Sequence, residues 1–321
     1  MSKVRCLQLV VKLIGFFLVV SLAQGDVPDA EREALIALYD STGGDFWDNN
    51  SNWKGPPGSE NTWYGVTTDE NNTTVTRISI SRNNLVGPLP AQLGHLSNLE
   101  SLTLDSNKLS GSIPAELFNL TNLRGLSLVH NQLTGGIPTE VGNANSLRGL
   151  YLGMNRLSGK IPSELGNLTN LSTLTLSRNQ LIGNIPSELG NLINLHYLIL
   201  SDNMLGGRIP ANLGNLANLQ WLFLNDNQLT GRIPSEFENL LNLLILWLDN
   251  NDLTGPIPME LMKLVNLTNN KSDFRYNHLY TGNDALRVFL DSKQIDGDWE
   301  SSQTPPYGLS MPWIPLQLLQ D

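Results

Sequence analysis

Cysteine is nearly absent from this chain, whose 321 residues include only Cys6. A protein of this size without disulfide bonds must obtain its stability from packing. The four histidines stand far apart without the spacing of metal ligands, and no nucleophile motif, phosphate-binding loop or kinase segment occurs. The sequence therefore predicts no enzyme, no cofactor and no bound metal.

Long apolar runs are also scarce, and the one clear example lies at the N-terminus. Lys3 and Arg5 precede an apolar run from Leu9 to Leu22, and the small residues of Ala23-Gln24-Gly25 follow it. This layout is typical of a secretory signal peptide, so we expect residues 1–25 to be cleaved and the protein to be extracellular or at the cell surface. A retained membrane anchor is the alternative, although the run is shorter than the ~20 residues that a bilayer span needs. No later segment is apolar enough for a transmembrane helix.

Positive charge is in short supply, because 20 Lys and Arg residues face 30 Asp and Glu residues and leave a net charge of −10. Removing the expected signal peptide takes away three positive charges and no negative one, so the mature chain is more acidic still. An acidic surface repels phosphate groups, which makes nucleic acids and anionic membranes poor partners.

A repeat of 24 residues dominates the remaining sequence. In each repeat an asparagine follows an apolar-x-apolar pair, such as Leu102 and Leu104 before Asn107, and a ninth asparagine, Asn277, comes after a longer interval. The alternating pair predicts a short strand with one buried face, and stacked repeats place these strands in a parallel sheet. We expect the asparagine amides to bond backbone groups in the turn after each strand. These structural asparagines are Asn83, Asn107, Asn131, Asn155, Asn179, Asn203, Asn227 and Asn251.

A second motif, Gly-x-Ile-Pro, marks the outward part of each repeat, as at residues 111–114. The complete frame, Leu-x-x-Leu-x-Leu-x-x-Asn-x-Leu-x-Gly-x-Ile-Pro-x-x-Leu-Gly, resembles the plant-type leucine-rich repeat of receptor-kinase ectodomains, co-receptors and polygalacturonase-inhibiting proteins. The resemblance covers residues 77–280. It implies a curved, right-handed α/β solenoid of about 9 coils of 24 residues, with a concave parallel sheet that binds ligands.

Both ends of such a solenoid need a cap, because an open end would expose the leucines of the last coil. In the predicted front cap, residues 26–76, Asp29 is expected to cap a helix that ends at Gly43-Gly44, and three tryptophans are expected to fill the core of the cap. The segment Trp63 to Thr68 resembles the plant-type cap motif Trp-x-Gly-Val-x-Cys, with Thr68 in the place of the cysteine. In this departure the cap resembles those of microbial leucine-rich-repeat proteins.

The predicted rear cap, residues 281–302, also lacks cysteine. Asn283 and Asp284 are expected to cap a helix over about Ala285 to Ser292, and Trp299 is expected to close it. Residues 303–321 contain four prolines and are expected to form an irregular tail.

The side chains that alternate with the strand leucines should face outward from the concave sheet. They form two columns that are small and polar in the early coils and become apolar and aromatic in three later ones. Such a patch on a solvated surface suits a peptide, a protein or a sugar ring, although the rings could also pack on one another or on the rear cap. The patch consists of Tyr197, Ile199, Trp221, Phe223, Ile245 and Trp247.

Acidic residues border this patch where the strands end, and we expect Asp202, Asp226 and Asp249 to orient the ligand. A carboxylate pair ~5 Å apart would suit glycoside hydrolysis, and clustered oxygens would suit calcium. We favour neither interpretation, because acids at strand ends are ordinary in an acidic protein and an open sheet should not raise the pKa of a carboxyl.

The combined features predict a secreted recognition protein that binds a protein, peptide or glycan through its concave face. An inhibitor of a cell-wall hydrolase is one form that the family resemblance suggests. A structural or adhesive spacer at the cell surface is the alternative, in which the aromatic patch would be dispensable. A glycan-acting enzyme is a third interpretation, and it predicts that Asp226→Asn abolishes turnover.

Overall fold

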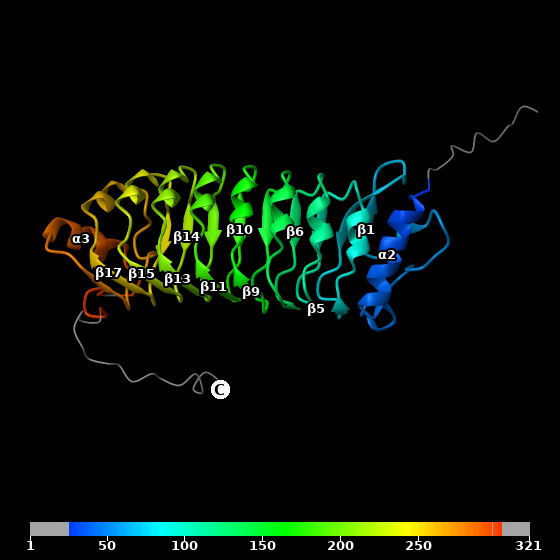
Figure 1. Ribbon diagram of the computed structural model, residues 1–321, viewed down its shortest axis with the longest axis horizontal. Helices are drawn as coiled ribbons and strands as arrows, with labels where there is room; N and C mark the ends of the chain where they lie inside the picture. Colours follow the sequence, from blue (N-terminus) through cyan, green and yellow to red (C-terminus); the bar gives the residue numbers. More distant parts are fainter. Residues whose placement is uncertain (1–25, 297, 304–321) are drawn as a thin grey trace, which may run out of the picture.

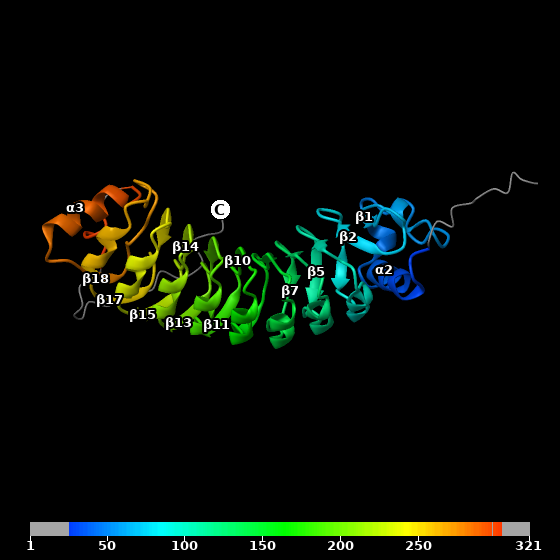
Figure 2. The same cartoon turned by 90° about the horizontal axis from the view of Figure 1, so that it is seen from above.

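The computed structural model describes residues 26–296 and 298–303. The predicted signal peptide and nearly all of the predicted C-terminal tail lie outside the described residues. The described chain forms one row of stacked coils that curves into an arc with a helix at each end (Figures 1 and 2). Helix α2 (Asp29–Ser41) belongs to the first end and helix α3 (Asp284–Lys293) to the second.

The apolar-x-apolar segments form a single sheet on the inner side of the arc (Figure 2). β1 and β2 are antiparallel, and every later strand is parallel to the one before it. The register places each residue beside the residue 24 positions further on, so that Leu150 pairs with Leu174 and Leu174 with Leu198. The predicted concave parallel sheet is thereby confirmed. Its strands are β1 (Val66–Thr68), β2 (Val75–Ser79), β4 (Ser101–Thr103), β6 (Gly125–Ser127), β8 (Gly149–Tyr151), β10 (Thr173–Thr175), β12 (Tyr197–Ile199), β14 (Trp221–Phe223) and β16 (Ile245–Trp247).

A second ladder of short strands follows the asparagine turns, and the sequence had not indicated it. It consists of a three-stranded sheet early in the row and a six-stranded sheet later. Each coil thus pairs with its neighbours at two places, which leaves few backbone groups unpaired. The strands are β3 (Val86–Pro88), β5 (Lys108–Gly111), β7 (Gln132–Leu133), β9 (Ser158–Lys160), β11 (Gln180–Asn184), β13 (Met204–Arg208), β15 (Gln228–Gly231), β17 (Asp252–Pro256) and β18 (His278–Tyr280).

Short 3-10 helices line the outer side of the arc, each beginning directly after the proline of a Gly-x-Ile-Pro motif or its equivalent. The proline fixes an extended entry and cannot continue a helix backwards. Two more such helices, η1 (Gly44–Phe46) and η2 (Glu60–Thr62), lie in the front cap. The outer helices are η3 (Ala91–His95), η4 (Ala115–Asn119), η5 (Thr139–Asn143), η6 (Ser163–Asn167), η7 (Ser187–Asn191), η8 (Ala211–Asn215), η9 (Ser235–Asn239) and η10 (Met259–Lys263).

The repeated asparagines bond the turn after each strand to the coil before it. Asn155 is typical: its Oδ1 accepts the backbone N–H of Leu133 at 3.0 Å, and its Nδ2 donates to the carbonyls of Leu128 and Leu152 at 2.9 and 3.1 Å. Because the side chain is only 8% exposed, these backbone groups would lack partners without it.

A second asparagine ladder runs along one flank of the solenoid. Its amides donate to backbone carbonyls 25 residues earlier, at 2.7 to 3.0 Å. These bonds are exposed to water, so each stabilises the stack less than a bond of the buried ladder does. The donors are Asn122, Asn170, Asn194, Asn218, Asn242 and Asn266.

The front cap is held by aromatic packing, but its helix begins differently from our expectation. Pro28 is the N-cap residue and no side chain caps the helix, so the prediction that Asp29 is the cap was wrong. Asp29 lies in the first turn instead, where a carboxylate faces the positive end of the helix dipole. Thr68, at the position of the family cysteine, donates a hydrogen bond to Asn72 Oδ1 at 2.7 Å. Buried rings fill the cap, namely Tyr39, Trp47, Trp53 and Trp63, with centroids 4.9 to 5.8 Å apart.

The rear cap packs helix α3 over the last coil. Asn283 Oδ1 accepts the N–H of Leu286 at 2.9 Å, which is the expected cap, and the helix extends one residue further at each end than our expectation. Trp299 is fully buried behind the helix. Gln294, directly after the helix, reaches back to the last coil and donates to Asp273 Oδ1 at 2.8 Å.

Candidate ligand-binding site

The strand register brings the six apolar patch residues together on the concave face. Tyr197 pairs with Trp221, which pairs with Ile245 in the next coil. In the second column Ile199 pairs with Phe223, and Phe223 pairs with Trp247. The two columns lie two residues apart on the same face of the sheet, so the patch is continuous over β12, β14 and β16.

Four of these side chains form one run of contacting rings, which we call the aromatic tier: Tyr197, Trp221, Phe223 and Trp247. Tyr197 meets Trp221 edge to face at 4.9 Å. Trp221 stacks on Phe223 at 5.8 Å, and Phe223 stacks on Trp247 at 4.4 Å, with their planes within 10° of parallel. The rings therefore do pack on one another, as the alternative interpretation supposed. They still leave surface to solvent, since Trp221 is 37% exposed and the other three are half-buried.

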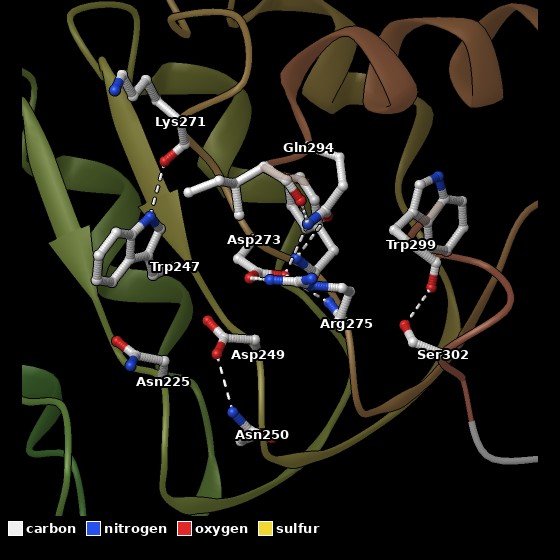
Figure 3. A network of polar contacts seen from close by, with 12 residues as sticks. Asn225, Trp247, Asp249, Asn250, Lys271, Asp273, Arg275, Gln294, Trp299 and Ser302 are labelled. Carbon is white, nitrogen blue, oxygen red and sulfur yellow. Dashed lines mark hydrogen bonds and ion pairs between the residues drawn. The ribbon is translucent and has the colours of Figure 1, made fainter. Parts of the chain in front are cut away.

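Hydrogen bonds hold the polar atoms at both ends of the aromatic tier. Trp247 Nε1 donates to the carbonyl of Lys271 at 2.7 Å, and Tyr197 Oη donates to Gln220 Oε1 at 3.3 Å (Figure 3 shows the first). Rings fixed in this way lose little conformational entropy when a ligand covers them.

Three carboxylates border the tier where its strands end, and we call Asp202, Asp226 and Asp249 the acidic rim. Asp202 forms an exposed ion pair with Arg178, with Nε and Oδ2 3.8 Å apart. Asp226 Oδ2 accepts a hydrogen bond from Asn225 Nδ2 at 2.6 Å, and Asp249 Oδ2 accepts one from Asn250 Nδ2 at 3.0 Å.

The electrostatics of this rim contradict one of our expectations. Burial raises the pKa of Asp249 to about 7, and the nearby carboxylates Asp273 and Asp226 add to the rise. The pKa of Asp226 is also raised, chiefly by burial and then by Asp202 and Asp273. The expectation that an open sheet leaves its carboxyl groups unperturbed was wrong, because burial and several like charges act together at this edge.

A polar cluster next to the rim escaped sequence reasoning because the last coil is longer than the others. Asp273 follows Trp247 in the second column, and Arg275 binds its carboxylate from Nη2 at 2.5 Å and from Nε at 2.9 and 3.1 Å (Figure 3). Gln294 donates to the same carboxylate. Arg275 therefore forms its ion pair with Asp273 and not with Asp249. Its positive charge lowers the pKa of Asp249, but this effect is smaller than the rise caused by burial and the other carboxylates.

Asn225 occupies the position next to Asp249 in the neighbouring coil. Its side chain is 7% exposed, and its Oδ1 has no hydrogen-bond partner among the described residues. A buried amide oxygen without a partner costs about 1–3 kcal/mol, so this corner of the site holds an unused hydrogen-bond acceptor.

The residues do not gather as metal ligands do. Among residues 26–296 and 298–303, no group of three or more His, Cys, Asp or Glu side chains could hold a metal ion. The calcium interpretation of the rim therefore has no ligand set in this part of the chain.

Comparison with known families identifies the repeats. A leucine-rich-repeat model matches residues 73–133, and a second one matches five consecutive repeats, residues 146–168, 170–192, 194–216, 218–240 and 242–264. The chain therefore belongs to the leucine-rich-repeat family. No curated protein matches it in a sequence search.

Solved structures of plant proteins share this solenoid. The ectodomain of the receptor kinase GASSHO1/SCHENGEN3 from Arabidopsis thaliana, in complex with CASPARIAN STRIP INTEGRITY FACTOR 2, is 35% identical with a TM-score of 0.74, and the match covers 83% of this chain. The ectodomain of the Arabidopsis receptor kinase HAESA, in complex with an IDA peptide hormone, is 34% identical over 78% of this chain, with a TM-score of 0.67. The matches span 34% and 41% of those ectodomains, so this chain corresponds to less than half of either.

A plant ice-binding protein has a more similar length. It is 26% identical with a TM-score of 0.63, and the match covers 84% of this chain and 94% of that protein. The repeats are thus of the plant type, whereas the microbial resemblance of the caps stays a prediction. No helix in the described part of this chain is long and apolar enough to cross a membrane.

Proposed function

We propose that this protein is an extracellular recognition protein that binds a peptide, or a peptide segment of a larger partner, on its concave face. The observation that carries the proposal is the aromatic tier. Four rings stand in contact on the concave face of three adjacent coils, whereas the equivalent positions of the early coils hold small residues such as Ser101, Gly125 and Ser127. Partly exposed, rigid aromatic side chains are the typical anchors of binding interfaces.

The comparisons support a peptide over a glycan, because the two receptor ectodomains described above were solved with peptide or protein ligands. Secretion, use of the concave face and the identity of the ligand belong to the proposal. The tier would supply most of the binding energy and the acidic rim would set the orientation of the ligand.

A combined peptide and glycan array tests this proposal. The full chain, purified from a secreting host, is compared with the double variant Trp221→Ala/Trp247→Ala and with Tyr151→Ala, which removes an aromatic ring from the same face two coils before the tier. Circular dichroism first establishes that all three proteins fold.

We expect the wild type and Tyr151→Ala to bind to peptides on the array. The double variant should lose this binding. Signals confined to glycans would redirect the proposal to a sugar ligand. Equal signals from all three proteins, or none, would favour the structural or adhesive spacer. A separate assay, in which ice crystals grow in the presence of the protein, tests a further outcome. Crystals whose shape the protein changes would favour a role like that of the plant ice-binding relative.

A further inference from the structure

The end of each concave strand carries one residue in a left-handed backbone conformation, directly before the repeated asparagine. Along the row these residues change in charge. The early coils present basic or neutral side chains, including Arg82, His130 and Arg178, whereas the next two coils present Asp202 and Asp226, all with φ between 52° and 58°. The Arg178–Asp202 ion pair lies at the change of sign. This column is therefore acidic only in the two coils of Asp202 and Asp226, beside the aromatic tier, and it is neutral again at Asn250 and Tyr276.

Asp226 and Asp249 stand together at this edge. The backbone N–H of Asp226 donates to the carbonyl of Asp249 at 3.0 Å, so the two residues lie on adjacent coils. Asp249 follows Trp247 by two positions and shares its face of the sheet, as Figure 3 shows. Neither carboxylate has an ion pair with a described basic residue, because Arg178 pairs with Asp202 and Arg275 with Asp273.

The two rim carboxylates have only neutral amide donors, Asn225 Nδ2 for Asp226 and Asn250 Nδ2 for Asp249. Asn225, which lies between Phe223 and Asp226 in sequence and beside Asp249 in the sheet, keeps a buried Oδ1 without a partner among the described residues. Asp105 occupies the equivalent position of an early coil, and its Oδ1 does have partners. It accepts hydrogen bonds from Ser127 Oγ at 2.6 Å and from the N–H of Val129 at 2.9 Å. Each carboxylate can accept more hydrogen bonds than one amide provides, so a ligand with several N–H donors would add bonds to Asp226 and Asp249.

We propose that Asp226 and Asp249 bind a positively charged side chain of the peptide ligand, whose neighbouring residues pack on the aromatic tier. This inference rests on the proposed function and names the chemistry of the ligand. A guanidinium group suits the site best, because it offers a planar set of donors to two carboxylates and stacks on aromatic rings such as Trp247. The acidic surface of the whole chain would attract such a ligand over a distance.

Three blocked hexapeptides of alternating glycine with arginine, glutamine or glutamate test the charge of the ligand. Their binding to the full chain is measured by tryptophan fluorescence at low ionic strength, where charge interactions are least screened. We expect the arginine peptide to bind at least about tenfold more tightly than the glutamine peptide, and the glutamate peptide to bind most weakly.

The double variant Asp226→Asn/Asp249→Asn should lose the preference for arginine. The control variant Asp252→Asn/Glu236→Gln removes the same amount of charge from exposed positions outside the concave sheet. This control should retain the preference for arginine. The preference of the wild type should also increase from about pH 5.5 to about pH 8, because protons compete with the guanidinium group for the carboxylates. The rim variant should show no such increase.

Equal binding of the three peptides, or an unchanged preference in the rim variant, would overturn the cation site. If the proposed function is wrong, the result is different: the ligands found on the array still bind the variant Trp221→Ala/Trp247→Ala. If the array ligand needs the tryptophans and yet arginine is not preferred, the cation site alone is wrong.

Discussion

Replacing Asp249 by asparagine should stabilise the protein at neutral pH and flatten its pH dependence. The pKa of this carboxyl is about 7 in the folded chain, against an ordinary 3.8. Between these values the folded chain retains a proton that the unfolded chain has released, so the free energy of unfolding falls as the pH rises. The stabilisation lost between pH 5 and pH 7 amounts to about 2 kcal/mol, after allowance for screening at a partly exposed carboxyl.

Urea denaturation followed by far-ultraviolet circular dichroism measures this effect. The wild type should unfold at a lower urea concentration at pH 7 than at pH 5, with an unchanged slope. Asp249→Asn should remove most of this difference and be more stable than the wild type at pH 7. Asp252→Asn, an exposed change outside the concave sheet, should leave the pH dependence as it is. A wild type that gains stability from pH 5 to pH 7, or an Asp249→Asn variant that keeps the wild-type dependence, would refute the reasoning.

Two further comparisons test the stacking of the coils, both by urea denaturation. Asn155→Ala removes at least three hydrogen bonds from buried backbone groups and should lower the free energy of unfolding by about 2–4 kcal/mol. Asn170→Ala removes one exposed hydrogen bond and should lower it by under about 1 kcal/mol. Similar losses in the two variants would contradict the claim that the buried asparagines stabilise the stack more than the exposed ones. Gly87→Ala would place a Cβ 2.1 Å from the carbonyl oxygen of Ser41, so it should cost more than about 2 kcal/mol. Gly159→Ala also lies at a positive φ, 78° against 128° for Gly87, but its Cβ would meet no atom within 4 Å, so it should cost only about 1 kcal/mol. Equal losses would show that the positive φ and not the clash with Ser41 decides the cost.

The sequence predicted the solenoid and the concave patch because a fixed repeat also fixes the register. Once Leu102 and Leu104 are assigned to a strand, every position 24 residues further on faces the same way. Tyr197 and Trp221 could therefore be placed side by side from the sequence alone. The second asparagine ladder was also visible in the sequence as a repeat, since Asn194, Asn218 and Asn242 recur every 24 residues.

The remaining features depend on details that a repeat pattern does not contain. Stacking of Trp221 on Phe223 depends on side-chain rotamers, which the spacing of residues leaves open. The raised pKa of Asp249 depends partly on Asp273, which belongs to the coil that departs from the period. The position of the N-cap of helix α2 at Pro28 was missed because an aspartate suits both the N-cap and the first turn.

The most direct test of binding at the concave face is calorimetric titration of the peptide found on the array into three proteins: the wild type, Trp221→Ala/Trp247→Ala and Tyr151→Ala. If the aromatic tier anchors the ligand, the double variant should bind at least about 30-fold more weakly, equivalent to about 2 kcal/mol, and Tyr151→Ala should bind within about threefold of the wild type. Wild-type affinity in a folded double variant would contradict the assignment of the aromatic tier as the binding site.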